Sequence, residues 1–260
     1  MAPVFETWIS LGLALGIGLG LGQFVPIKSV AGRVMVGATL IHLILLVVNV
    51  KLSFSLIEIF SVICALGFFG CVIFLRNVIR NGERANLLNP VFILPLLFSL
   101  AVTIGPPPQY QMFEWDEFAS WAYWAKELYL TDTLLEPTMQ WRDLGYPQGW
   151  PLALVFPQIL FGEFNPQRSL AIGLVWHAAT LGIAYEFIVA YLRDRWGLVG
   201  TSPRIVGYTF VFAMILAEAL YKFVPQNLLI EQPQILLITS VFLLLFHISI
   251  GTERTRSGVL

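Results

Sequence analysis

The sequence has 260 residues, of which 57% are hydrophobic and only 12% are charged, and its formal net charge is −1. Soluble domains carry about 25% charged residues, so this composition excludes a soluble globular domain, a disordered chain and a nucleic-acid-binding protein. It indicates an all-α protein, a polytopic bundle of transmembrane helices. The two cysteines, Cys64 and Cys71, lie in one apolar stretch and are interpreted as small packing residues, not as a disulfide or as metal ligands.

A helix needs about 20 apolar residues to cross a bilayer. On that criterion we predict seven spans, at residues 8–25, 34–50, 54–75, 89–105, 169–192, 205–221 and 233–250. The first has no basic segment before it and no cleavage site after it, which favours a retained helix over a signal peptide. Its Gly12, Gly16 and Gly20 recur every four residues, a spacing typical of close helix packing.

Residues 106–168 separate the fourth span from the fifth and are rich in polar residues and tryptophan. Three prolines, at 106–108, end the fourth helix. The segment 147–162 is apolar but contains three prolines, and as a helix it would cover only about 24 Å. It is either a short span or a helix in the membrane interface, and Pro157 is expected to break it.

The distribution of basic residues favours an interfacial segment. If 147–162 does not cross, ten basic residues lie on one side of the membrane and five on the other, as the excess of basic residues in cytoplasmic loops requires. The larger group is Lys28, Arg33, Arg76, Arg80, Arg84, Arg193, Arg195, Arg204, Arg254 and Arg256. The N-terminus is then outside and the C-terminus cytoplasmic. We therefore expect a four-helix membrane segment at 1–105, an external loop with interfacial helices at 106–168, and a three-helix membrane segment at 169–260.

Within the loop, residues 114–130 predict a helix lying along the membrane surface. From Phe118 onward, apolar residues recur every three or four positions, with Tyr123 and Glu127 among the polar residues of the opposite face. Asp116 and Glu117 lie at its N-terminal end. Acidic residues there stabilise a helix and are equally candidates for chemistry, so both explanations remain open.

Four motifs occur in a fixed order in this half of the chain. They are the acidic pair Asp116-Glu117, the turn Tyr146-Pro147-Gln148-Gly149, the step Phe161-Gly162 with Arg168 before the next span, and Glu231-Gln232-Pro233 before the last span. This series resembles integral-membrane glycosyltransferases of the GT-C type, especially the bacterial relatives of protein O-mannosyltransferases and of lipid A aminoarabinose transferase. The resemblance covers residues 112–245, and because such enzymes have ten or more spans, it identifies this chain with their N-terminal part.

The resemblance implies a hexosyl- or pentosyltransferase of the bacterial inner membrane that contributes to a cell envelope glycan. A polyprenyl-phosphate-linked sugar would be the donor, and a hydroxyl of a glycan, lipid or protein the acceptor. Asp116 would be the catalytic base with Glu117 beside it, while Arg168 and Lys126 would bind the donor phosphate. Glu231 would line the same cavity or help to bind Mg²⁺ or Mn²⁺.

Two other functions remain open. One is a non-catalytic membrane subunit or remnant of such an enzyme, and the other is a transporter or flippase of lipid-linked sugars, although no internal repeat supports the latter.

The acidic residues within the predicted spans do not require a functional role. Glu58 is near a span end, Glu218 has Lys222 one turn away, and Glu186 lies on the opposite side of its helix from His177.

Overall fold

The computed structural model describes residues 2–52, 54–81, 84–104, 122–132, 149–159, 161–220 and 235–245. All secondary structure in these ranges is helical. The elements are α1 (Ala2–Gly22), α2 (Val30–Leu52), α3 (Leu56–Asn81), η1 (Arg84–Leu88), α4 (Pro90–Ile104), α5 (Ala122–Thr131), α6 (Gly149–Val155), η3 (Phe156–Gln158), α7 (Pro166–Trp196), α8 (Ser202–Leu220) and a helix at Ile235–Leu245. The prediction of an all-α fold is confirmed.

Each of the seven predicted spans coincides with an apolar helix. Three of these helices have the length and hydropathy needed to cross a membrane: Val30–Val48 in α2, Leu56–Asn81 in α3 and Arg168–Trp196 in α7. The other four have shorter apolar stretches, of 10–17 residues. The protein is therefore helical with three candidate spans, and the crossing of the remaining four stays a prediction.

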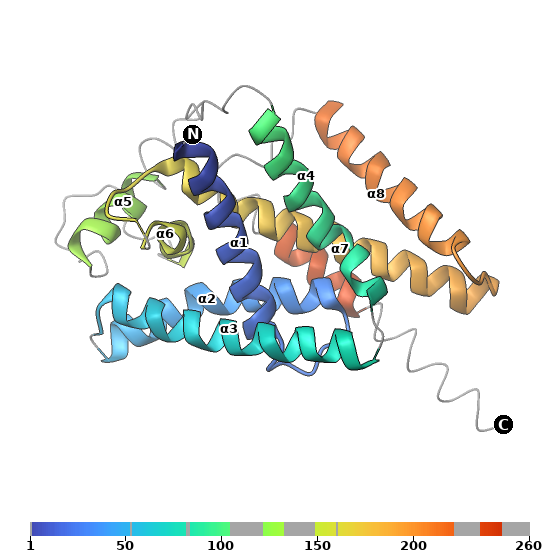
Figure 1. Ribbon diagram of the computed structural model, residues 1–260, viewed down its shortest axis with the longest axis horizontal. Coiled ribbons are helices and arrows are strands. Elements are labelled where there is room, and N and C mark those ends of the chain that lie inside the picture. The colour runs from blue at the N-terminus through green and yellow to red at the C-terminus, as the bar shows by residue number, and fades with distance from the viewer. Residues whose placement is uncertain are drawn as a thin grey trace.

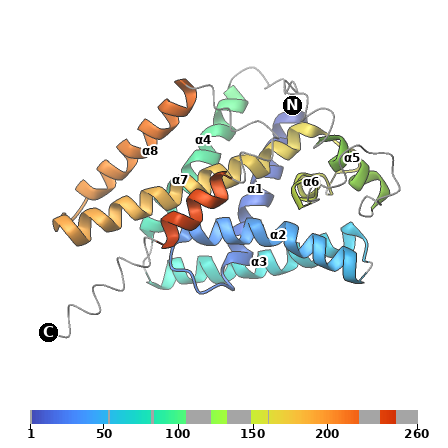
Figure 2. The same cartoon turned by 180° about the vertical axis from the view of Figure 1, so that it is seen from behind.

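The long helices form one packed bundle. Figure 1 shows α2 and α3 running side by side, with α1 crossing them and α7 passing along the same bundle. Figure 2, seen from behind, shows the helix Ile235–Leu245 lying across α7. There the Thr180 hydroxyl lies 3.1 Å from the Ser240 hydroxyl. α4 and α8 both pack on α7, so α7 contacts most of the bundle.

Glycines bring α1 close to α2 and α3. A methyl group on Gly20 would overlap the backbone of Gly67 in α3, and one on Gly37 of α2 would overlap the carbonyl of Gly18. The predicted close packing is thus confirmed at Gly20, whereas a methyl group on Gly12 or Gly16 would meet no atom within 4 Å. The prediction of close packing through Gly12, Gly16 and Gly20 was therefore only partly right. The partners of α1 lie on two of its sides, and α1 contacts them also through Gly18 and Gly22.

The described parts of the segment 106–168 pack at one end of the bundle. Figure 1 shows α5 and α6 together beside the α2–α3 junction and the start of α7. The backbone N–H of Leu56, at the start of α3, donates to Asp132 Oδ1 at 2.6 Å. Asp132 directly follows α5 and has a φ of 57°. We call this the loop end, formed by the start of α1, the α2–α3 junction, α5, α6, η3 and the start of α7.

α5 has the predicted buried face and α6 ends where predicted, while a position at the membrane surface stays a prediction for both. In α5, Ala122, Ala125 and Leu128 are buried and Lys126 is exposed, as the predicted amphipathic pattern requires. α6 ends at Val155, and Pro157 lies in the 3₁₀ turn that follows. The seven residues of α6 cover about 11 Å as a helix, which is too short to cross a bilayer core of about 30 Å. Pro157 therefore interrupts the helix as predicted.

Candidate functional site

The structure describes two of the five predicted site residues. Asp116, Glu117 and Glu231 lie outside the described residues, and so do the side chains of Glu218 and Lys222. Arg168 lies in the first turn of α7 and Lys126 lies on α5. The geometry of the loop end is therefore built around Arg168.

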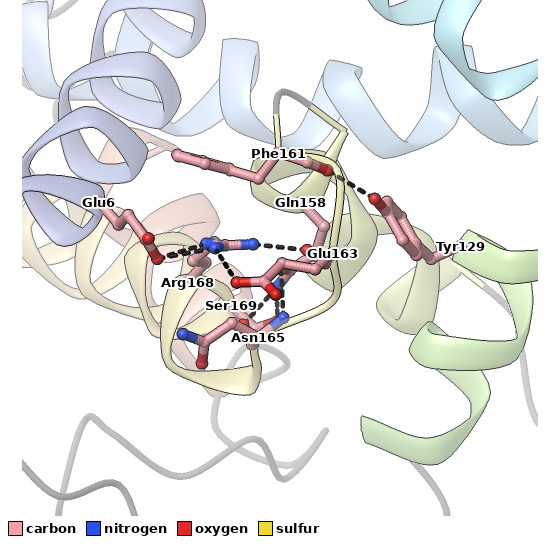
Figure 3. A network of polar contacts seen from close by, with 8 residues as sticks. All are labelled: Glu6, Tyr129, Gln158, Phe161, Glu163, Asn165, Arg168 and Ser169. Atoms are coloured by element: carbon pink, nitrogen blue, oxygen red, sulfur yellow. Dashed lines mark hydrogen bonds and ion pairs between the residues drawn. The ribbon is translucent and has the colours of Figure 1, made fainter. Parts of the chain in front are cut away.

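Arg168 is the most strongly engaged charged residue at the loop end (Figure 3). Its side chain is only 2% exposed. Its Nε and Nη2 donate to a single carboxylate oxygen, Glu6 Oε2, at 2.9 and 2.7 Å. Its Nη1 donates to the carbonyl oxygen of Glu163 at 2.5 Å. Because burial of an unpaired guanidinium is very costly, Glu6 makes this position of Arg168 possible.

Two further groups enclose the guanidinium. The Glu163 carboxylate lies 3.4 Å from Nη2, and its side chain is 78% exposed. The Phe161 ring covers the guanidinium at 4.0 Å from its carbon to the ring centroid, a cation–π arrangement. One cation thus faces two carboxylates, of which Glu6 makes the shorter and more buried contact and Glu163 the longer and more exposed one.

A polar network around Gln158 fixes the turn that carries these residues. Gln158 Nε2 donates to the Asn165 carbonyl and to the Ser169 hydroxyl, and its Oε1 accepts from the Asn165 N–H. Ser169 in turn donates to the carbonyl of Leu154 in α6. The hydroxyl of Tyr129 in α5 donates to the Phe161 carbonyl at 2.5 Å. The network therefore ties α5, α6 and α7 into one unit.

Local sequence explains why α7 begins here. Pro166 is its first residue, where proline loses no helical hydrogen bond and its fixed φ suits the helix. The Arg168 N–H donates to the Asn165 carbonyl at 3.0 Å. The helix start therefore sets the position of Arg168 relative to the turn at 161–165.

Lys126 is exposed on α5. Within the part of the chain that the structure describes, no carboxylate forms an ion pair with it. One turn of the helix also carries Tyr123 and Glu127. Desolvation of the Tyr123 phenol, followed by its hydrogen bond to the Glu127 carboxylate, raises the pKa of that phenol.

Glu6 is the residue that the sequence interpretation missed. It precedes the first apolar stretch, and 162 positions separate it from Arg168. Its one sequence signal is an acidic residue at a predicted external end, opposite in charge to Arg168. Glu163 was not among the predicted site residues either, because nothing in a turn sequence indicates that both its backbone and its side chain contact the same arginine.

Among the residues that the structure describes, no group of three or more His, Cys, Asp or Glu is arranged to hold a metal ion. The geometry shows a buried guanidinium held by Glu6, with the exposed Glu163 carboxylate as a second and longer contact. No known protein family, curated protein or solved structure matches the chain.

Proposed function

We propose that this chain is a membrane glycosyltransferase-like protein that transfers a sugar from a polyprenyl-phosphate donor to an acceptor hydroxyl at the loop end. One observation supports the proposal most directly. The segments that follow the predicted acidic motif belong to a folded unit, in which α5, α6 and the start of α7 are joined through Tyr129, Gln158 and Arg168. A catalytic carboxylate needs such a rigid support.

The acidic pair is close to this unit along the chain. Six positions separate Asp116 from Ala122, the first residue of α5, so chain length limits their separation to about 20 Å. In the proposal, Asp116 removes the proton of the acceptor hydroxyl and Glu117 is its charged neighbour. The proton passes to the Asp116 carboxylate as the acceptor oxygen bonds to the sugar, and the polyprenyl phosphate departs with its bonding electrons.

Arg168 has the chemistry required at the leaving group. A guanidinium makes charge-assisted hydrogen bonds to phosphate oxygens, and here Nη2 is the nitrogen that the Glu163 carboxylate contacts. In the proposal, the donor phosphate takes the position of the exposed Glu163 carboxylate, whose contact with Arg168 is 3.4 Å, while Glu6 keeps its contact at 2.7 Å. Lys126 and Glu231 are proposed as further ligands of the donor, the latter directly or through Mg²⁺ or Mn²⁺.

The engagement of Arg168 by Glu6 and Glu163 also favours a second function. A guanidinium whose nitrogens are already bonded is typical of a structural ion pair. The chain would then be a non-catalytic membrane subunit that keeps the loop end folded for a larger transferase. In that case phosphate exchange at Arg168 does not occur.

Neutralising Asp116 separates the two functions. In membranes containing the full chain and a polyprenyl-phosphate-linked sugar, we expect Asp116→Asn to lower transfer at least 100-fold, because general-base catalysis contributes about 10²–10⁴-fold. The matched control is Glu127→Gln, which removes an acid from the polar face of α5. Transfer that is unchanged in Asp116→Asn would refute the catalytic proposal and support the subunit.

A further inference from the structure

A cavity of about 250 Å³ lies at the end of α7 opposite Arg168. Three basic residues from three elements line it: Lys28 before α2, Arg193 in the last turn of α7, and Arg204 in the first turn of α8. Asn86, Asn89 and Ser29 are among its polar lining residues. The cavity is therefore built by the convergence of distant parts of the chain and does not belong to the loop end.

Among the described residues that line the cavity, Glu186 is the one acid, and its carboxylate has other partners. Its Oε1 accepts from the Ala31 N–H in the first turn of α2 at 3.1 Å and from Asn89 Nδ2 at 2.6 Å. The carboxylate thus lies on the positive end of the α2 dipole. The neighbouring Ser29 hydroxyl accepts from the Gly32 N–H at 2.7 Å. Glu186 therefore completes the N-terminus of α2.

The three cations of the cavity are left without a compensating acid. Lys28 and Arg193 are exposed and Arg204 is half-buried. Within the described part of the chain, none of Lys28, Arg193 and Arg204 forms an ion pair. Three positive charges against one negative charge leave the lining with a net charge of +2. This surface attracts an anion.

The position of the cavity along α7, and therefore across the membrane, indicates which anions reach it. Arg168 and Arg193 are 25 positions apart on one helix, which corresponds to about 38 Å at 1.5 Å per residue. A bilayer's hydrocarbon core is about 30 Å thick and its headgroup regions extend it to about 40–45 Å. With Arg168 at one surface of the membrane, the cavity therefore opens at the headgroup level of the opposite leaflet.

We propose that this cavity binds a phosphate group, that of an anionic phospholipid of the leaflet opposite the loop end. Arg193 and Arg204 offer planar donors that match phosphate oxygens, and Lys28 adds a point charge. The volume is several times the roughly 30 Å³ share of one water molecule, so a phosphate with part of its headgroup fits. Binding there joins α7, α8 and the α1–α2 connection, and does not depend on the proposed transferase activity.

The test uses the full chain purified in detergent and titrated with short-chain phosphatidylglycerol. Native mass spectrometry measures the bound fraction. We expect Arg193→Gln and Arg204→Gln each to weaken binding about five-fold, the amount expected for one basic residue at an anionic lipid surface. Arg80→Gln is the matched control, because Arg80 is an exposed arginine in the last turn of α3 and does not line the cavity. It should change binding less than about two-fold.

Two further titrations identify the source of the phosphate. Zwitterionic short-chain phosphatidylcholine should bind more weakly than phosphatidylglycerol. If inorganic phosphate competes with phosphatidylglycerol and loses affinity in the same two variants, the phosphate site is supported with a free anion as a ligand; if it does not compete, a lipid is the ligand. Failure of wild type to bind either anion, or equal effects of Arg80→Gln and the cavity variants, would overturn the proposal. Arg193→Lys, which keeps the charge, replaces any glutamine variant that does not fold.

Discussion

At the scale of single residues, the decisive contact is the buried pair formed by Glu6 and Arg168. Removing one partner of a buried ion pair leaves the other charge without compensation and costs about 3–5 kcal/mol, whereas replacing both by apolar residues is close to neutral. The same asymmetry explains why a buried arginine by itself says little about function. Its partners decide whether it is available to a ligand.

We therefore expect Arg168→Leu to lower the free energy of unfolding by about 3–5 kcal/mol, and Glu6→Leu to restore much of that loss when the two are combined. The measurement is a denaturant titration of the full chain in detergent, analysed as a double-mutant cycle. Lys126→Gln, at an exposed position of α5, is the control and should change stability by less than about 0.5 kcal/mol. Additive single effects would show that Glu6 and Arg168 do not interact.

Sequence reasoning reached Arg168 but not its environment. The arginine was recognisable as a lone cation at the head of an apolar helix. Glu6 was not, since 162 positions separate the pair and no local periodicity relates them. The cavity lined by Lys28, Arg193 and Arg204 was missed for the same reason. The sequence analysis counted these three residues on one side of the membrane, but a count of charges contains no information on whether they lie close together.

At the scale of elements, local patterns predicted most of what the structure contains. Apolar length predicted the seven apolar helices, three-and-four spacing predicted the buried face of α5, and Pro157 predicted the end of α6. These features depend on the residues of one segment only. The close contacts of α1 depend on two partner helices. The glycine spacing therefore predicted that α1 packs closely, but it predicted only some of the positions at which α1 does so.

The glycines give a paired test of that packing. Gly20→Ala should destabilise the bundle by about 1–3 kcal/mol, because the new methyl group overlaps the backbone of Gly67, which cannot move like a flexible side chain. Gly12→Ala meets no atom within 4 Å and gains helix propensity of up to about 1 kcal/mol. Thermal unfolding in detergent measures both. A similar loss in the two variants would mean that α1 packs through a different face.

At the scale of the whole molecule, segments predicted to share a side of the membrane lie together. The loop end gathers the start of α1, the α2–α3 junction and α5–α6, while the cavity gathers the residues before α2, η1 and the α7–α8 connection. This grouping agrees with the charge distribution in the sequence, which assigns the loop end to the outside. The assignment of inside and outside remains a prediction from the basic residues.

Accessibility labelling tests that assignment. In a background with Cys64 and Cys71 replaced by alanine, an impermeant maleimide should label Lys126→Cys in intact cells, because position 126 is exposed on α5. Val199→Cys, at an 83% exposed position between α7 and α8, should react only after permeabilisation. Labelling of both positions in intact cells would refute the predicted topology, and the reverse pattern would invert it.

The pairing of Glu6 with Arg168 has a consequence for biogenesis. Translation delivers Glu6 to the membrane first, and its counterion emerges 162 positions later, after α2, α3, α4, α5 and α6 have been made. Until then the nascent first helix carries an uncompensated carboxylate, which holds its beginning at the aqueous boundary. Contacts between such distant positions form slowly, so we expect the Glu6–Arg168 pair to form only after α7 has been made.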